Sequence, residues 1–233
     1  MTGFSFSRFF GCLWITVALT LTTACSALRP KETPPPSYYT LDRAVPEAST
    51  AAGGAAMVSP TDLVLIVDPP HAAAGFDSSR IVYTRGEHRF EYFAHSEWVD
   101  TPARMLPPLM ASAIARAGVV RAVVLAPSSA RGDLRLDTEI IMLVQDFAVQ
   151  PSQVRFTLRA TIVDDSTHKV IAGNEFDQTV AASTDDPFGG VVAANIAVTR
   201  ALNALAKFCG EAAQTWQRSR PIPSALLPDS PRR

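Results

Sequence analysis

The feature that most constrains the fold is a strict alternation of apolar and polar side chains over residues 153–163. The apolar positions are Val154, Phe156, Leu158, Ala160 and Ile162, and the polar positions are Gln153, Arg155, Thr157, Arg159 and Thr161. Successive side chains of a strand point to opposite faces, so this segment predicts a strand with one buried face and one solvated face. Such strands are typical of antiparallel sheets that are covered on one side only.

Two further strand-like segments flank this one, at residues 134–147 and 170–180. The residues Asp164-Asp165-Ser166-Thr167 provide a turn between the second and third segments. We therefore expect a C-terminal antiparallel meander of three strands. Residues 140–144 are apolar at every position, which places the first meander strand near the centre of the sheet.

Four shorter elements precede the meander. Residues 63–67 form a continuous apolar run that predicts a strand buried on both faces. Residues 37–42 and 123–125 are rich in strand-favouring side chains. Residues 81–84 and 89–93 flank a polar turn and predict a hairpin.

Two helices are expected. Thr101-Pro102 has the composition of a helix start, but Pro107-Pro108 predicts a break, so we expect a short turn followed by a helix over residues 107–117 that Gly118 ends. The last helix opens at Asp186-Pro187. Its apolar stripe, at spacings of three and four, consists of Val198, Ala201, Leu202, Leu205, Phe208, Cys209, Ala212 and Trp216.

These elements predict one domain of the α+β (mixed α/β) class. Its central sheet is largely antiparallel, ends in the C-terminal meander, and carries two main helices packed on one face. The chain has 233 residues and is 47% hydrophobic, which is enough for a substantial core. We place the domain at residues 37–218, followed by a disordered Pro-rich tail at 219–233.

The N-terminus has the order of a secretory signal: a basic residue, an apolar run and small residues at a cleavage site. Arg8 precedes the apolar residues 9–21, and Leu21-Thr22-Thr23-Ala24-Cys25 follows. This ending resembles the lipobox of bacterial lipoproteins, which implies a signal peptide at 1–24, cleavage between Ala24 and Cys25, and a lipid attached to Cys25. A plain secretory signal and a spanning helix are the alternatives, although the run is shorter than the ~20 residues that a span needs.

Residues 25–36 are rich in proline and predict an extended tether between the anchor and the domain. The three cysteines are Cys12, Cys25 and Cys209. Cleavage removes the first and acylation blocks the second, so no internal disulfide can form. We interpret Cys209 as a small core residue, with a reactive thiol as the alternative.

No pattern of catalytic or cofactor-binding residues is found. Nucleophile and phosphate-loop motifs are missing, so we expect no enzyme and no cofactor. The four histidines are not spaced as zinc ligands, although His88 and His95 could meet near the hairpin. Without Arg8 the chain carries 20 basic and 22 acidic side chains, a balance that gives no reason to expect nucleic-acid binding.

Aromatic side chains are concentrated in and after the predicted hairpin. Tyr83, Tyr92, Phe93 and Trp98 are candidates for a partner-binding surface, because clustered aromatics are common in protein interfaces. The alternative is that they fill the core between the hairpin and the first helix.

The order of these features resembles the ABC-type transport auxiliary lipoproteins, the family of the paraquat-inducible C lipoprotein. The resemblance covers residues 37 to 216. Its motifs, in order, are Tyr38-Tyr39-Thr40-Leu41-Asp42, Phe76-Asp77-Ser78-Ser79-Arg80-Ile81-Val82-Tyr83, Trp98 before a helix, Gln145-Asp146-Phe147 at a strand end, and Trp216 at the end of the last helix. Two departures are Glu97, where the family usually has a basic residue, and the Pro107-Pro108 pair.

The resemblance implies a non-enzymatic accessory protein of a phospholipid or lipid transport system in a Gram-negative bacterium. Its partners would be the membrane, through a palmitate-bearing anchor, and a periplasmic protein of the mammalian-cell-entry type. Ser26 after the anchor implies sorting to the outer membrane, with the domain facing the periplasm. An envelope-assembly or membrane-integrity lipoprotein without a transport role is the alternative, and a homo-oligomer remains open.

Overall fold

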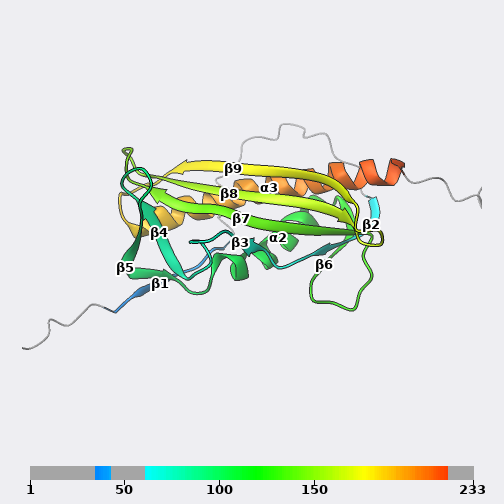
Figure 1. Cartoon of the computed structure of the whole chain (residues 1–233), viewed down its shortest axis with the longest axis horizontal. Helices are drawn as coiled ribbons and strands as arrows, with labels where there is room; N and C mark the ends of the chain where they lie inside the picture. Colours follow the sequence, from blue (N-terminus) through cyan, green and yellow to red (C-terminus); the bar gives the residue numbers. More distant parts are fainter. Residues whose placement is uncertain (1–34, 43–60, 220–233) are drawn as a thin grey trace, which may run out of the picture. The chain divides into compact units, whose positions relative to one another are not determined.

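The computed structural model describes residues 35–42 and 61–219. Residues 36–42 and 61–219 belong to one compact unit and form two helices and a nine-stranded sheet. In chain order the elements are β1 (Ser37–Tyr39), β2 (Thr61–Val67), β3 (His71–Ala72), β4 (Arg80–Thr84), β5 (Phe90–Trp98), α2 (Pro102–Ala117), β6 (Val120–Leu125), β7 (Leu134–Asp146), β8 (Gln153–Asp164), β9 (Val170–Ala181) and α3 (Pro187–Ser219), as Figure 1 shows. The predicted α+β class is confirmed.

Strand β7 is the centre of the sheet. One edge of β7 pairs along its length with β8 in antiparallel fashion. The other edge is shared by three strands that pair with it in parallel, in the order β2, β3 and β4 from its start to its end. Strand β2 also pairs with β6, whereas β4 pairs with β5 and β5 pairs with β1, so the sheet divides into two branches beside β7. The prediction that the first meander strand is central is therefore confirmed.

The meander β7–β8–β9 has the predicted two-sided character. The five apolar side chains of β8 are all buried, and most of the alternating polar side chains reach the opposite face. On that face Arg155 pairs with Asp177 (2.7 Å), and Arg159 pairs with Glu139 (2.9 Å) and Glu175 (3.2 Å). These cross-strand ion pairs join all three strands of the meander.

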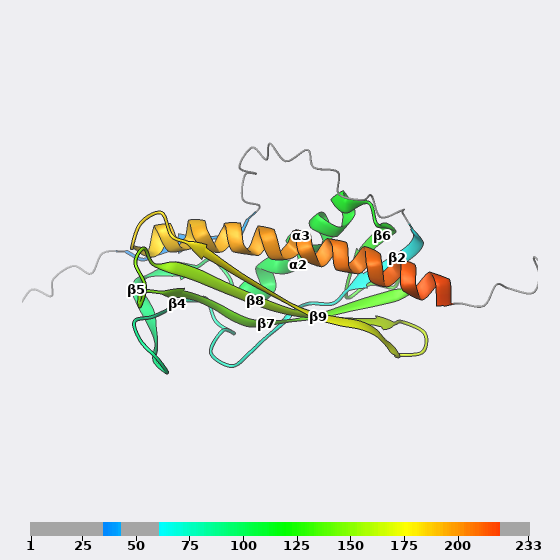
Figure 2. The same ribbon diagram turned by 90° about the horizontal axis from the view of Figure 1, so that it is seen from above.

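Both helices lie on the same side of the sheet, as Figure 2 shows. Helix α3 packs on β8 and β9 and beside α2, and its predicted apolar stripe is buried apart from the partly buried Phe208. By length and composition α3 could cross a membrane, but 61% of its most apolar window is buried in the protein. In this structure α3 is therefore the core helix of the domain.

The prediction that Pro107-Pro108 breaks the first helix is wrong. Helix α2 runs without interruption from Pro102 to Ala117 and ends at Gly118, which has the left-handed φ of 62°. Interior prolines cost roughly 3 kcal/mol through lost hydrogen bonds and steric conflict. Packing offsets this cost, because Leu106, Met110 and Ile114 are fully buried and each contributes about 1.5–3 kcal/mol.

One end of the meander is fixed by polar contacts. At the β8–β9 turn, the Asp164 carboxylate accepts hydrogen bonds from the Ser166 hydroxyl (2.6 Å), the Thr167 N–H (2.9 Å) and the Trp216 indole N–H (2.8 Å). The Ser166 hydroxyl is the main cause that holds the pKa of Asp164 well below its ordinary value, and the backbone and indole donors add to it. This carboxylate therefore ties the turn to the end of α3.

Candidate partner-binding surface

The β4–β5 hairpin carries most of the predicted site. Its strands pair Tyr83 with Glu91 and Thr84 with Phe90 around the polar turn. The Thr84 hydroxyl donates to the Gly86 carbonyl (2.6 Å), and His88 adopts a left-handed φ of 62° in the turn. The hairpin predicted from the sequence is confirmed, and its turn is closed by local hydrogen bonds.

The structure divides the four predicted aromatic residues instead of gathering them. Tyr92 and Phe93 are consecutive in β5, so their side chains point to opposite faces of the sheet. Tyr92 is 40% exposed, and the Arg80 guanidinium lies 5.0 Å from its ring centre. Trp98 is only 3% exposed and belongs to the main core. Its ring therefore offers no surface to a partner, and for this residue core filling is the correct interpretation.

Tyr83 and Phe93 form a half-buried aromatic cluster with Phe147 from the β7–β8 loop. The ring centres are 4.5 Å apart for Tyr83 and Phe93, and 5.7 Å apart for Tyr83 and Phe147. The Arg85 guanidinium lies over both Tyr83 (5.3 Å) and Phe147 (5.9 Å). Rings in these arrangements attract one another beyond simple area burial. The cluster therefore joins the hairpin to the neighbouring loop.

A polar network closes the same hairpin. The Tyr83 hydroxyl donates to Glu91 (2.8 Å), and Arg89 forms an ion pair with Glu91 (2.7 Å). The hydrogen bond to Glu91 raises the pKa of Tyr83, and the same bond lowers the pKa of Glu91. Both shifts keep the hydroxyl protonated and the carboxylate ionised at neutral pH, so the network persists there.

Two exposed aromatic residues, Tyr38 and Phe90, are not among the site residues predicted from the sequence. Tyr38 of β1 pairs in register with Glu97 of β5, and Phe90 is 51% exposed beside the hairpin turn. Phe90 contacts the buried Phe76 edge-on at 5.6 Å, so it lies next to the small second core of Phe76, Val82 and Val144. Strict alternation along residues 90–93 could have shown that Phe90 and Tyr92 share one face. The position of Tyr38 could not be predicted in this way, because no local sequence pattern indicates that β1 pairs with β5.

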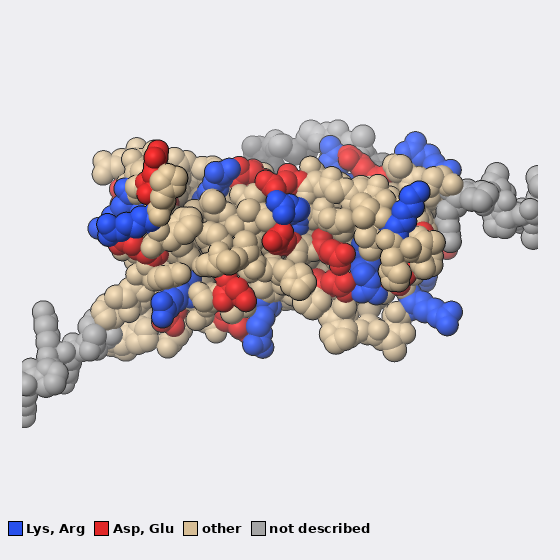
Figure 3. Space-filling model, in the orientation of Figure 1, with Lys and Arg blue, Asp and Glu red and all other residues tan. Residues whose placement is uncertain are grey.

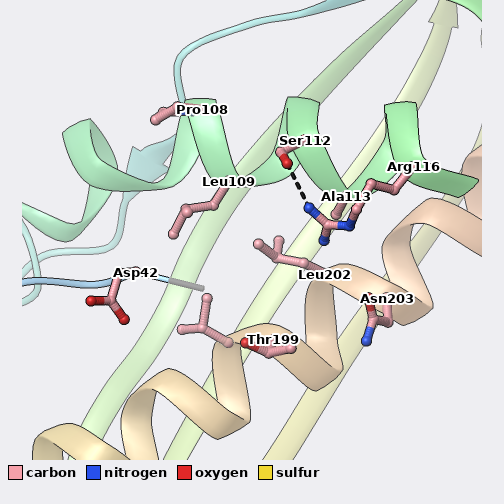
Figure 4. A pocket seen from close by; sticks show the side chains of 10 residues that line it. Asp42, Pro108, Leu109, Ser112, Ala113, Arg116, Thr199, Leu202 and Asn203 are labelled. Atoms are coloured by element: carbon pink, nitrogen blue, oxygen red, sulfur yellow. Dashed lines mark hydrogen bonds between the residues drawn. The ribbon is translucent and has the colours of Figure 1, made fainter. Parts of the chain in front are cut away.

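A groove of about 280 Å³ lies between α2 and α3 (Figure 4). Its lining residues are Asp42, Pro108, Leu109, Ser112, Ala113, Arg116, Val198, Thr199, Leu202 and Asn203. The Arg116 guanidinium donates to the Ser112 hydroxyl one turn earlier in α2 (2.5 Å). The lining contains one carboxylate, of Asp42, and one guanidinium, of Arg116, but no histidine, cysteine or lysine.

Ionisable groups also meet beside the start of β7. Arg135 bridges Asp68 (2.6 Å) and Asp165 (2.8 Å). Burial raises the pKa of Asp137, with further contributions from its hydrogen bond to Asp68 and from the charge of Asp68. Within residues 35–42 and 61–219, no group of three or more His, Cys, Asp or Glu side chains is arranged to hold a metal ion.

Cys209 is buried in α3, and burial raises the pKa of its thiol to about 12. A thiol in this state is protonated at neutral pH and inaccessible to reagents. The interpretation of Cys209 as a core residue is therefore confirmed. The predicted anchor site, Ala24 and Cys25, lies outside the described residues, as do the signal peptide and nearly all of the tether.

The chain belongs to the family of ABC-type transport auxiliary lipoprotein components, whose family model matches residues 39–206. The resemblance inferred from the sequence is thereby confirmed, and membership indicates a membrane-anchored place in the cell envelope. No curated protein matches the chain.

Solved structures support the fold. Protein XCC0632 from Xanthomonas campestris is similar with a TM-score of 0.67 at 20% identity, over 78% of this chain and 100% of that one. A second structure, of an uncharacterised protein, is similar with a TM-score of 0.58 at 11% identity, over 75% of this chain and 99% of that one. At these identities the likeness shows that the fold is shared.

Proposed function

We propose that this protein is an outer-membrane-anchored periplasmic accessory lipoprotein of an ABC-type phospholipid transport system of the mammalian-cell-entry kind. It acts by binding partner subunits and has no catalytic activity of its own. The observation that carries this proposal is the family match over residues 39–206, which covers nearly all of the described domain. ATP hydrolysis and substrate translocation belong to other subunits of the system.

The anchor is the first part of the proposal. Cys25 carries the lipid, cleavage occurs after Ala24, and Ser26 directs the protein to the outer membrane. Cys25→Ala should abolish palmitate labelling and leave the uncleaved precursor. Cys209→Ala is the matched control, because it removes the other cysteine of the mature chain and should leave labelling intact. Unchanged labelling of Cys25→Ala would rule out this attachment site.

The partner surface is the second part. We assign it to the face of the sheet opposite the helices, where Tyr92 lies exposed beside Arg80. Tyr38 and Arg80 both pair in register with Glu97, and side chains of residues paired in register lie on the same face of a sheet. Tyr38 therefore extends this surface. Tyr83 and Phe93 serve this surface indirectly by holding the hairpin to the β7–β8 loop. Acidic and basic side chains are interspersed on the face that Figure 3 shows, so this face has no large patch of one charge. We therefore expect aromatic contacts, rather than electrostatic attraction, to dominate the proposed recognition.

Site-specific crosslinking in living cells tests this surface. A photoreactive residue in place of Tyr92 should capture a mammalian-cell-entry subunit, whereas the same residue in place of Val170, exposed at the opposite end of the sheet, should not. Capture of that subunit at neither position, together with its absence after co-purification, contradicts the transport role and favours the envelope-assembly alternative. Capture of a second copy of the chain at Tyr92 would assign the surface to self-association instead.

A further inference from the structure

Three loops meet at one end of the sheet, which we call the loop end: residues 85–89, 147–152 and 182–188. Contacts of the middle loop, residues 147–152, and of the adjoining end of β7 link the other two. Phe147 packs against Tyr83 beside the hairpin turn (5.7 Å between ring centres). The Ser152 N–H donates to the Asp185 carboxylate (2.7 Å), and the Gln145 amide donates to the Asp186 carbonyl (3.2 Å). The loop end is therefore a connected surface built from separate parts of the chain.

Exposed apolar side chains concentrate at the loop end. Phe90 borders the hairpin turn, Val149 lies in the β7–β8 loop and Phe188 lies in the first turn of α3, with exposed fractions of 51%, 38% and 61%. Together with Tyr92 and Val192, they account for five of the nine large apolar side chains that are exposed in the described residues. Each of the three loops thus contains or adjoins one exposed apolar side chain, an arrangement that folding of the domain alone does not require.

The path of the chain into the domain points to what covers this end. Strand β1 runs parallel to β5, with Ser37 beside Ser96 and Tyr39 beside Trp98. Strand β5 begins at the hairpin turn, so residues before Ser37 enter the sheet from the side of the loop end. Phe90 precedes Ser96 by six residues in β5, so it lies about 20 Å from Ser96 in the direction of the loop end. The twelve residues from Cys25 to Ser37 span up to about 40 Å, so an anchor at Cys25 leaves the loop end free to reach the membrane.

We propose that the loop end contacts the bilayer surface, with Phe90, Val149 and Phe188 inserted at the headgroup level. The proposal rests on the lipid anchor at Cys25 and adds a second, non-covalent membrane contact to it. Aromatic and aliphatic side chains at loop tips partition into this region, where one side is apolar and the other is wet. The chemistry selects uncharged or zwitterionic phospholipid, because Arg85 and Arg89 of the turn are outnumbered by the acidic side chains Glu87, Glu91, Asp185 and Asp186, and no excess of basic charge favours anionic lipid.

A membrane fits these residues better than a protein partner does. The three side chains come from three separate segments at the loop end, and none of them lines a described pocket. The contact also fixes an orientation. Strand β8 runs from the β7–β8 loop to the turn before Val170, so Val170 would lie roughly 35–40 Å from the lipid surface.

Depth-dependent fluorescence quenching tests the contact. The mature acylated protein is reconstituted into phosphatidylcholine vesicles that carry bromine on the acyl chains, with Phe90→Trp as the reporter and Val170→Trp as the control. Both positions are exposed and apolar, so both variants should fold. After subtraction of the wild-type signal, Phe90→Trp should lose roughly half of its added emission, and Val170→Trp should lose none. Added salt should not reduce the quenching, since the contact does not depend on net charge.

Vesicle flotation in the same samples separates this proposal from the proposed function. If the protein floats with the vesicles but Phe90→Trp is not quenched, the anchor holds and the loop-end contact is wrong. Equal quenching at both positions also overturns the contact, because it shows no preferred orientation. If Phe90→Trp is unquenched in vesicles and a photoreactive residue at position 90 captures a transporter subunit in cells, the loop end is a protein interface. Failure to float contradicts the anchor itself.

Discussion

The meander and the β4–β5 hairpin are both antiparallel, yet they use their two faces differently. In the meander, the inward side chains of β8 are buried under α3, and the outward face is a ladder of ion pairs. In the hairpin, aromatic side chains occupy both faces near the turn, and Tyr92 and Phe90 stay exposed. The difference shows that the same local pairing buries one face of β8 completely in one region and leaves aromatic side chains exposed in the other.

The largest expected effect separates the two regions by a matched pair of truncations. Phe156→Ala removes a fully buried ring of β8 and should lower the free energy of unfolding by about 3–5 kcal/mol, because it leaves a cavity. Phe90→Ala removes a half-exposed ring of the hairpin and should cost less than about 1 kcal/mol. Chemical denaturation of both variants measures the difference. Equal costs would mean that the hairpin is part of the stabilising core.

Removal of the Asp164 carboxylate should have the next largest effect. Asp164→Asn keeps one oxygen for the turn donors and places its NH₂ group against the indole N–H of Trp216, so two donors face each other, and the change should cost about 2–3 kcal/mol at neutral pH. The pKa of Asp164 is lowered on folding, so its contribution is present above the ordinary value of 3.8 and is lost as the pH falls below it.

The stability difference between the wild type and Asp164→Asn should therefore shrink between about pH 5 and pH 2, as measured by denaturation at each pH. Asp62→Asn is the control, because the pair of Asp62 with Arg121 is exposed and its loss should change the stability by less than about 1 kcal/mol. A difference that stays constant with pH would show that the carboxylate charge does not stabilise the turn.

A third substitution tests the junction between the two regions. A Cβ at Gly190 of α3 would collide with the amide of Gln145, which is buried and bonded to Ser152 and Asp186. Gly190→Ala should therefore cost about 1–3 kcal/mol, although alanine is the better helix former. Gly86→Ala in the exposed hairpin turn meets no atom within 4 Å and should be nearly neutral, which makes it the matched control. Thermal unfolding of both variants checks the prediction, and a neutral Gly190→Ala would show that Gln145 can move.

The smallest expected effect concerns the outward face of the meander. Arg159→Met breaks the pairs with Glu139 and Glu175, but all three side chains are about half exposed to solvent. Exposed ion pairs contribute about 0–1 kcal/mol, so the loss should be within that range and should vanish in high salt. Denaturation at low and high salt measures it. A larger and salt-independent loss would indicate that this face is covered rather than solvated.

Much of the fold follows from local patterns. Alternation in residues 153–163 identified the meander, and spacings of three and four identified α3, because these periods reflect the geometry of a single strand or helix. The site was harder to predict. A register shift in the β4–β5 pair lies between Tyr92 and Glu97, and it changes which face the later residues occupy. Simple alternation therefore could not show that Trp98 is buried while Tyr92 is exposed.

Sequence alone determined the class of fold, the position of the meander and last helix, the core role of Cys209 and the family. Each of these depends on periodicity or motifs within one segment. Tertiary structure alone decided that α2 continues through two prolines, that three parallel strands share one edge of β7, and that Phe90, Val149 and Phe188 lie at the same end of the sheet. These features depend on contacts between segments far apart in the chain, where burial of side chains such as Leu106 and Met110 outweighs local preference.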